Sequence, residues 1–446
     1  MSQAPVGQAS APGAGLGGAA GVNQGPGGGL VRPGLKALDT ALAELLAFAQ
    51  PLEVREHVAT FDADGCVLAQ NVVSALQVPP QDNSSMDGYA LYCADAAQPG
   101  AELPVSQRIA AGSSGPALQP GTVARIFTGA PIPAGADAVV MQEDCEVLPS
   151  GAIRVKAAPT RNQWIRRAGE DVQHGQVVLA AGQRMAPAEL GLAASIGLSH
   201  LIVSAKPRVA LFSTGDELVM PGTVAPGDMK PGAIYNSNRF FLRALLLRLG
   251  CEVTDLGIVP DQRGATIAAL QDAAQNHDLI LTSGGVSVGE EDHIKPAVQA
   301  LGQLDLWQIA MKPGKPFAYG QINRNSNANG HGKPTHFIGL PGNPVSSFVT
   351  FLLLVRPFLL RLQGVQNVAA PMQMLPAHFN GPKADKRREF LRVRRNAAGG
   401  LDLFPNQSSG VLTSAVWADG LVDNPAGNAI QNGDLLRFTA LSDLLA

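Results

Sequence analysis

Residues 281–292 read Leu-Thr-Ser-Gly-Gly-Val-Ser-Val-Gly-Glu-Glu-Asp, an apolar strand end that runs into a turn of glycines and hydroxyls and then into acids. The run from Asp278 to Leu281 lacks helical spacing and is typical of a buried parallel strand. Open α/β sheets bind their ligands at the carboxyl ends of such strands. The stretch therefore predicts an α/β domain with a ligand site at this turn.

The turn carries the groups that a phosphate and a hard cation require. Gly284 and Gly285 let backbone N–H groups approach an anion, and Ser283 and Ser287 add hydroxyl donors. Asp292 can supply an oxygen ligand to a divalent cation beside those phosphates. The alternative is a surface turn that is merely rich in small residues.

Three further turns have the same character. Residues 212–217, Phe-Ser-Thr-Gly-Asp-Glu, again end a predicted strand in hydroxyls and acids. Residues 311–316, Met-Lys-Pro-Gly-Lys-Pro, hold two lysines between prolines, so the cations lose less backbone freedom when they bind an anion. Residues 340–347, Leu-Pro-Gly-Asn-Pro-Val-Ser-Ser, suit a helix start, whose free N–H groups attract anions. Together the four turns predict a large polyanionic ligand with a metal ion.

These motifs resemble the molybdenum insertases, the MoeA proteins and the related gephyrin E domain. So do Asp-Asn-Ser-Ser-Met-Asp-Gly-Tyr-Ala at residues 82–90 and Arg-Ile-Phe-Thr-Gly-Ala-Pro-Ile-Pro at residues 125–133. The resemblance runs from about Leu35 to the C-terminus, with the motifs in the family's order. It implies a transferase of molybdenum cofactor biosynthesis, which converts adenylylated molybdopterin and molybdate into molybdenum cofactor and AMP with the help of Mg²⁺. It also implies a homodimer whose active site lies between the sheet domain of one subunit and the inserted domain of the other.

The resemblance implies a role for each matching residue. The residues that it assigns to catalysis are Asp82, Thr128, Glu217, Asp261, Asp292, Lys312 and Lys315, of which Glu217 and Asp292 would hold the cation. The residues that it assigns to substrate binding are Ser283, Gly284, Gly285, Ser287, Pro316, Pro341, Ser346, Arg387 and Ser409. The pterin phosphate would lie on the glycine turn, and molybdate on the two lysines with Ser346, Arg387 and Ser409. The simpler alternatives are a solvated loop for the lysines and, for Glu217, an acid in the first turn of a helix.

The chain departs from the family pattern at three places. Asp261 is followed by Gln262, where a second acid is common, so a cation site made of two acids there is in doubt. Residues 406–410 replace a turn that is usually richer in glycine, which weakens the assignment of Ser409. Arg387 has Arg388 beside it, and either arginine could reach the anion.

The pattern of the chain predicts a multidomain protein of α/β and β architecture. Its expected parts are a disordered Gly/Ala/Pro-rich tail at 1–33, a linker domain made of 34–76 and 170–206, a β-rich module at 77–169, an α/β domain at 207–363 and a C-terminal β-barrel at 364–446. The resemblance implies that the module is inserted into the linker domain and that the α/β domain binds molybdopterin. The discontinuity of the linker domain is implied by the resemblance. An Asn-rich loop at 323–336 interrupts the α/β domain and is expected to carry no chemistry.

Several helices can be placed from the spacing of apolar residues. The leucines between Leu35 and Leu46 predict one amphipathic helix. Another is expected to open at Ser237 as its cap and to close at Gly250, with Phe241, Leu245 and Leu249 on its apolar face. The apolar run at 348–355 is too short to span a bilayer and predicts a buried helix.

Composition excludes several classes of function. A net charge of −3 gives no basic field for nucleic acid. Cys66, Cys93, Cys145 and Cys251 are too scattered for a zinc knuckle or a redox pair and suit a reducing cytosol. We therefore expect a cytoplasmic protein without nucleic-acid or membrane partners. The family resemblance adds the upstream adenylyltransferase and downstream molybdoenzyme maturation proteins as expected partners.

Two rival functions remain at this point. Molybdopterin adenylyltransferases share the sheet domain with its glycine turn, but they lack the inserted module and the barrel. A non-catalytic scaffold of the gephyrin type is the second rival. The residues that argue against it are the intact Asp82, Thr128, Glu217, Asp292, Lys312 and Lys315. A preference between molybdate and tungstate does not follow from the residues, because the two oxyanions are nearly identical in size and charge.

Overall fold

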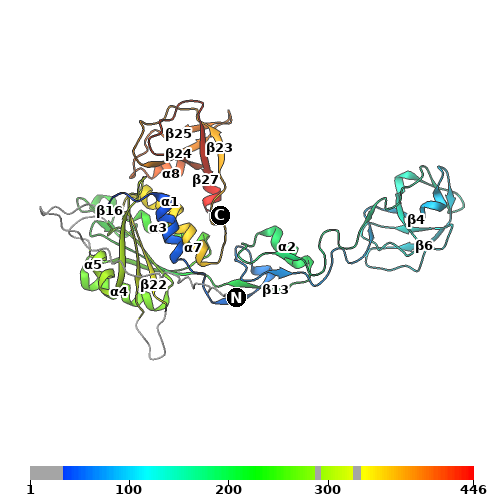
Figure 1. The fold of residues 1–446 in the computed structure, drawn as a ribbon, viewed down its shortest axis with the longest axis horizontal. Coiled ribbons are helices and arrows are strands. Elements are labelled where there is room, and N and C mark those ends of the chain that lie inside the picture. The colour runs from blue at the N-terminus through cyan, green and yellow to red at the C-terminus, as the bar shows by residue number, and fades with distance from the viewer. Residues whose placement is uncertain (1–33, 287–292, 325–332, 446) are drawn as a thin grey trace, which may run out of the picture.

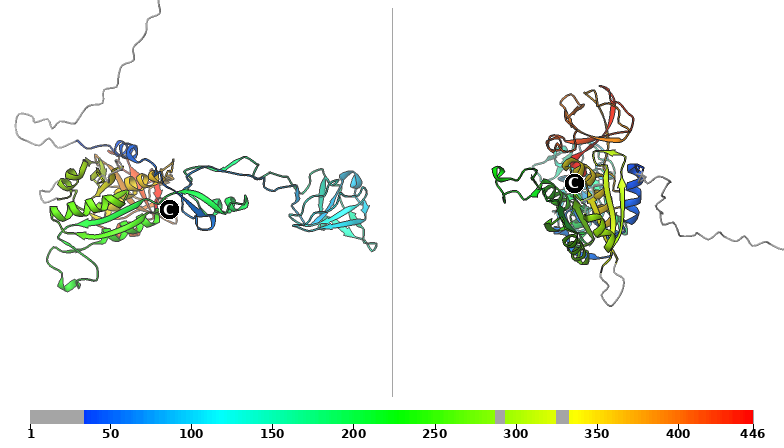
Figure 2. Two further views of the ribbon diagram at one scale, coloured as in Figure 1. Left: turned by 90° about the horizontal axis from the view of Figure 1, so that it is seen from below. Right: turned by 90° about the vertical axis from the view of Figure 1, so that its left-hand side faces the viewer.

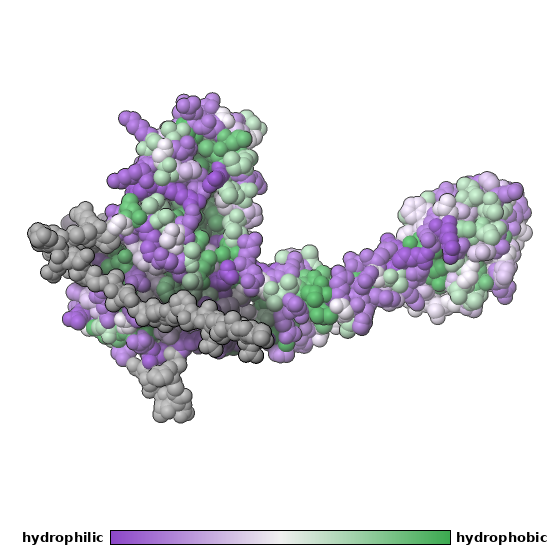
Figure 3. Space-filling model, in the orientation of Figure 1, coloured by the Kyte–Doolittle hydropathy of each residue, from purple (hydrophilic) through white to green (hydrophobic). Residues whose placement is uncertain are grey.

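The protein is elongated, with an α/β domain and a β-barrel at one end and a small β module at the other (Figures 1 and 2). The computed structural model describes residues 34–286, 293–324 and 333–445. A narrow linker domain joins the two ends, and its surface toward the module is mostly hydrophilic in the view of Figure 3. This is the multidomain α/β and β architecture that the sequence predicts.

A six-stranded sheet forms the centre of the α/β domain. Its order is β17 (Glu252–Val259), β14 (Arg208–Thr214), β18 (Leu279–Ser283), β22 (Thr335–Leu340), β21 (Pro316–Ile322) and β19 (Gly302–Gln308). The first four strands are parallel, and β21 runs antiparallel to both of its neighbours, β22 and β19. Every residue of β18 is buried, which confirms the predicted buried parallel strand. Because Ser213 lies opposite Ser283, the hydroxyl-bearing ends of β14 and β18 are level.

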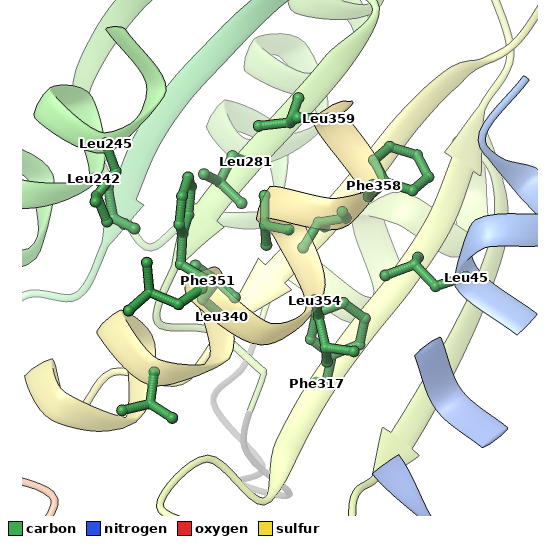
Figure 4. Packing of buried hydrophobic residues seen from close by; sticks show 14 of the residues in the cluster. Leu45, Leu242, Leu245, Leu281, Phe317, Leu340, Phe351, Leu354, Phe358 and Leu359 are labelled. Atoms are coloured by element: carbon green, nitrogen blue, oxygen red, sulfur yellow. The ribbon is translucent and has the colours of Figure 1, made fainter. Parts of the chain in front are cut away.

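Helices cover both faces of this sheet. One face packs against α1 (Leu38–Phe48), α3 (Ser237–Arg248) and a continuous helix made of α6 (Pro344–Thr350), a π-helical segment (Phe351–Val355) and α7 (Arg356–Leu362). The other face packs against α4 (Arg263–Asn276) and α5 (Ile294–Leu301). Figure 4 shows side chains of the continuous helix, among them Phe351 and Phe358, beside Leu281 and Leu340 of the sheet.

The continuous helix confirms the predicted buried helix at 348–355. Within the described residues it is the one helix long and apolar enough to cross a membrane, and 83% of its apolar window is buried inside the protein. It is a core helix of the α/β domain.

The start of α3 corrects one detail of the sequence analysis. Its cap is Asn236 and not Ser237, because the Asn236 side chain accepts a hydrogen bond from the Arg239 N–H at 3.3 Å. Gly250 has a φ of +77°, as its predicted role at the helix exit requires.

The linker domain is built from two segments that lie far apart in the sequence. Its paired strands are β1 (Arg55–Ala59) with β13 (His200–Ser204) and β2 (Val72–Val73) with β12 (Val177–Leu179). Helix α2 (Pro187–Ser195) and a 3₁₀ turn (Thr60–Asp62) complete it, and both segments share one apolar core.

The inserted module contains two small sheets and two 3₁₀ turns. The four-stranded sheet consists of β6 (Val105–Ile109), β7 (Val123–Ile126), β4 (Gly88–Leu91) and β8 (Ala138–Met141). The three-stranded sheet consists of β5 (Glu102–Leu103), β10 (Ile153–Val155) and β9 (Cys145–Val147). The 3₁₀ turns are Cys93–Ala96 and Gln142–Asp144, and β3 (Asn83–Ser84) pairs with β11 (Ile165–Arg166) where the module meets the linker domain.

The C-terminal domain is a barrel that takes one strand from the α/β domain. Its elements are β23 (Gln373–Pro376), β24 (Arg388–Arg395), β25 (Leu401–Leu403), α8 (Thr413–Trp417), β26 (Gly420–Asn424), β27 (Leu435–Ala440) and α9 (Leu441–Leu445). A bridge between Ala377 and Leu401 closes the sheet. Strand β20 (Met311–Lys312), from the lysine motif, pairs in parallel with the start of β24.

Candidate active site

A cleft of about 780 Å³ lies at the carboxyl ends of the parallel strands. Its walls come from the turns after β14 and β18, the start of α3 and the turn before α6. The predicted site residues that line it are Glu217, Asp261, Ser283, Gly284, Gly285, Pro316, Pro341 and Ser346. The structure therefore brings together, in one cleft, half of the residues that the sequence proposes. Ser287 and Asp292 lie outside the described residues, so their roles stay predictions.

The turn after β18 requires both of its glycines. Gly284 and Gly285 have φ values of +95° and +68°. A Cβ atom at Gly285 would lie 2.7 Å from the Cδ1 atom of Ile294. The chain can therefore follow this path only without side chains. The Gly284 N–H donates to the Leu340 carbonyl oxygen at 3.0 Å, which ties the turn to the end of β22.

Asn238 fixes this turn and was missed by the sequence analysis. Its Nδ2 atom donates to Ser283 Oγ and to the Gly342 carbonyl oxygen, both at 2.7 Å. The buried asparagine thus ties α3 to the end of β18 and to the turn before α6. The polar run at 236–238, which forms the cap and first residues of α3, was the available signal.

Two carboxylates, of Glu217 and Asp261, line the cleft. Glu217 lies in a turn between β14 and the short strand β15 (Leu218–Val219), so it is not an acid in the first turn of a helix. Strand β15 pairs with β16 (Ile234–Tyr235), and Leu218 and Ile234 give the cleft an apolar wall.

The described acids of the cleft suit a cation that is shared with a ligand. No cluster of three or more His, Cys, Asp or Glu side chains suited to a metal occurs in the part of the chain that the structure describes. Mg²⁺ usually takes one or two carboxylates and completes its shell with water and substrate phosphates. Glu217 and Asp261 line an open cleft, which suits such a shared site better than a site made of protein ligands alone.

The lysine motif lies where the α/β domain meets the barrel. Lys312 Nζ is 2.9 Å from Glu389 Oε1 and 3.4 Å from Asp385 Oδ2. The hydrogen bond to Glu389 is the main reason why the pKa of Lys312 is raised. Lys312 is thus held in place, whereas Lys315 is exposed and its carbonyl oxygen accepts the Ile309 N–H at 2.7 Å. A freely solvated loop is therefore the wrong description for Lys312.

The two adjacent arginines have different partners. Arg388 donates to Asp423 through two bonds of 2.6 Å and to Asp39 at 2.8 Å. Arg387 binds Asp385 at 3.0 and 3.1 Å and so belongs to the same ionic network as Lys312. Hydrogen bonds from Arg387 hold the pKa of the Asp385 carboxyl well below its usual range. Arg387, and not Arg388, therefore shares this ionic network with Lys312.

Ser409 lies on a loop that a buried arginine supports. Its carbonyl oxygen accepts the N–H of Val345, the neighbour of Ser346, at 2.9 Å, and Gly410 lines the cleft. Arg392 of β24 is almost fully buried and donates to Ser414 Oγ and to the Phe390 carbonyl oxygen at 3.2 and 3.0 Å.

Burial lowers the pKa of Arg392 to about 10, so it stays cationic at neutral pH. A buried cation therefore lies behind this loop. The sequence analysis missed it because β24 contains four arginines, and the sequence alone does not show which of them is buried.

Asp82 and Thr128 belong to the inserted module, whose strands β4 and β6 lie at the opposite end of the molecule from the α/β domain of the same chain (Figure 1). The Thr128 N–H and hydroxyl both donate to Asp87 Oδ1 at 2.8 Å, and these bonds lower the pKa of the Asp87 carboxyl. Asp82 instead pairs with Arg167 and accepts the Ala168 N–H at 2.9 Å. The exposed acid beside Thr128 is therefore Asp87, which the sequence analysis passed over within the same motif.

Three family models match the chain in order. They are the MoeA N-terminal region (domain I and II) over residues 36–197, the probable molybdopterin binding domain over residues 210–361 and the MoeA C-terminal region (domain IV) over residues 375–441. The strands, turns and acids described above are distributed over all three.

Individual proteins agree with these matches. The molybdopterin molybdenumtransferase of Haemophilus influenzae is 40% identical over 357 residues, which cover 80% of this chain and 85% of that protein. Molybdopterin molybdenumtransferase 2 of Mycobacterium tuberculosis is 36% identical over 416 residues, which cover 88% of this chain and 97% of that protein. The crystal structure of the molybdopterin biosynthesis moeA protein from Pyrococcus horikoshii OT3 matches with a TM-score of 0.79 at 27% identity, over 91% of this chain and 100% of that chain.

Proposed function

The chain belongs to the MoeA family of molybdopterin molybdenumtransferases, and from that membership we propose that adenylylated molybdopterin exchanges AMP for molybdate in the cleft of the α/β domain. The protein is a transferase of molybdenum cofactor biosynthesis. The observation that carries the proposal is the glycine turn at 284–285, which opens into the same cleft as Glu217 and Asp261. The Gly285 N–H at the turn would bind the pterin phosphate, with Ser283 held in position by Asn238.

The departing AMP needs its developing negative charge neutralised. Mg²⁺ bound by Glu217, with Asp292 as the expected second carboxylate, would supply that charge stabilisation. Lys312, Lys315 and Arg387 would provide the fixed positive charge for the molybdate dianion. The apolar wall of Leu218 and Ile234 suits a flat heterocycle of the substrate.

The direct test is incubation of the purified protein with adenylylated molybdopterin, Mg²⁺ and molybdate. We expect AMP release together with active cofactor, and neither product without the pterin substrate. Incubation with ATP and molybdopterin should give no adenylylated pterin. Its formation would assign the cleft to nucleotidyl transfer instead.

A homodimer is the arrangement that lets the inserted module take part. The module that carries Asp87 and Thr128 lies far from the α/β domain of its own chain (Figure 1). Both side chains are exposed and hydrogen-bonded to each other, which suits a site completed by a second subunit. The exposed apolar side chains of Phe240 and Leu247, seven residues apart on α3, offer such a subunit a contact surface. We propose that each cleft is completed by the module of the partner subunit.

Two inactive subunits with different defects should regain activity when they are combined in one dimer. A heterodimer of Thr128→Ala and Glu217→Gln subunits, isolated with two affinity tags, contains one intact module facing one intact cleft. It should therefore show about half of the wild-type activity, although each homodimeric variant is nearly inactive. The readout is AMP release per dimer.

The matched control pairs Thr128→Ala with Asp87→Ala. Both defects then lie in modules, so neither cleft is complete and activity should stay low. Restoration by this second pair, or none by the first, would contradict a shared site.

Loss of Lys315 should raise the molybdate requirement selectively. The Lys315→Ala variant should need roughly 10- to 100-fold more molybdate, since a hydrogen bond to a charged group contributes about 1.5–3 kcal/mol. Affinity for adenylylated molybdopterin, measured by fluorescence titration, should change little. Lys333→Ala removes an equal charge from a surface pair with Glu53 and serves as the control. A collapse of pterin affinity would place Lys315 on the pyrophosphate instead.

We also propose a cytoplasmic location, in a reducing compartment. All four cysteines are free, and burial raises the pKa of the Cys145 thiol to about 11, which keeps it protonated and unreactive. An upstream adenylyltransferase and downstream cofactor-maturation proteins are the partners that this chemistry requires.

A further inference from the structure

Four charged side chains form one connected network at the junction of the α/β domain and the barrel. The chain of contacts runs from Arg387 to Asp385 (3.0 Å), from Asp385 to Lys312 (3.4 Å) and from Lys312 to Glu389 (2.9 Å). Strand pairing sets this geometry, because Lys312 of β20 lies opposite Glu389 of β24. The network is therefore part of the fold and not a chance meeting of surface side chains.

Glu389 is the most buried member of this network. Its side chain is 2% exposed, whereas that of Lys312 is 39% exposed. Its second carboxylate oxygen has a weak contact of 3.5 Å with Asn424 Nδ2. A carboxylate with so little solvent acts on neighbouring charges with less screening than a surface carboxylate does.

The two carboxylates oppose the binding of an oxyanion. Glu389 and Asp385 balance the positive charges of Lys312 and Arg387. They also accept hydrogen bonds from N–H groups that an oxyanion would otherwise use. A dianion beside these two cations also meets the repulsion of Glu389 and Asp385. The buried Arg392 lies further along β24 and offsets this repulsion in part.

We propose that Glu389, assisted by Asp385, sets the affinity for molybdate and keeps it low, so that the oxyanion remains exchangeable. The inference rests on the proposed function, which places molybdate at Lys312 and Arg387. Glu389 also positions Lys312, but its negative charge has a separate effect that position alone would not give. An amide in its place would keep the hydrogen bond and remove the repulsion.

The test is the affinity of sodium molybdate for the full-length protein, measured by equilibrium dialysis at fixed ionic strength. The Glu389→Gln variant keeps an oxygen that can accept from Lys312. Its dissociation constant should fall about tenfold, and the gain should shrink as salt is added. The Glu53→Gln variant removes one carboxylate from an exposed surface pair and should leave the constant unchanged.

Two further variants separate the possible failures. If Lys312→Ala binds molybdate as tightly as wild type, the oxyanion lies elsewhere and the proposed function is at fault. If Lys312→Ala weakens binding while Glu389→Gln leaves it unchanged or weakens it, Glu389 is only a structural partner and the inference is overturned. Asp385→Asn, at a more exposed position, should also tighten binding and takes the place of Glu389→Gln should that variant fail to fold.

Discussion

Replacing Glu217 by glutamine is expected to slow AMP release from adenylylated molybdopterin by about 100-fold or more. The substitution keeps the size of the side chain and removes the anionic oxygen that lines the cleft. If the carboxylate positions a cation in the transition state, the rate falls while substrate affinity changes little. Single-turnover release of AMP gives the rate, and fluorescence titration with the pterin gives the affinity.

Asp216→Asn is the matched control for this substitution. Asp216 is the adjacent exposed acid and does not line the cleft, so its loss should leave the rate close to wild type. High Mg²⁺ should recover part of the lost rate in the Glu217 variant. Equal losses of rate and affinity would instead assign Glu217 to substrate holding.

Phe358→Ala should destabilise the α/β domain by about 3–5 kcal/mol. Phe358 is fully buried on α7, and its ring meets the rings of Tyr319 and His336 at centroid distances of 6.2 and 5.0 Å (Figure 4). Its removal leaves a cavity in a core that closely packed helix and sheet residues cannot refill. The α/β domain should then unfold at a lower denaturant concentration.

The three tryptophans make this measurement specific to one domain. Trp164, Trp307 and Trp417 lie in the module, the α/β domain and the barrel respectively. With Trp164 and Trp417 replaced by phenylalanine, fluorescence reports on Trp307, which packs in the same core as Phe358. Leu306→Ala, at a side chain that is 42% exposed on β19, should cost about 1 kcal/mol or less. A similar loss in both variants would contradict the packing argument.

Local signals made much of this fold predictable. The apolar run at 279–281 and the glycines after Ser283 predict a buried strand and a ligand turn. Both predictions use only residues that are neighbours in the sequence. The predicted cap of α3 was Ser237, one residue after the observed cap, Asn236, because both side chains can cap a helix. Secondary structure and the position of the cleft therefore follow from neighbouring residues.

The partners of site residues did not follow from such signals. Asn238 meets Ser283 across 45 residues, Thr128 meets Asp87 across 41, and Lys312 meets Glu389 across 77. These contacts depend on how strands and domains are arranged, which no local pattern encodes.

Asp82 shows the opposite difficulty. The resemblance assigned it to the site, and only the three-dimensional arrangement reveals that Arg167 pairs with it, so its catalytic role stays a prediction.

The strand that the lysine motif lends to the barrel has a consequence for how the protein can be divided. Met311 and Lys312 belong to the α/β domain by chain order and to the barrel by hydrogen bonding. The barrel is therefore not an interchangeable cassette, since removing or replacing it would take away the neighbour that orients Lys312. Recombination between relatives would therefore have to exchange β20 and β24 together, although one strand precedes the domain border in the chain and the other follows it.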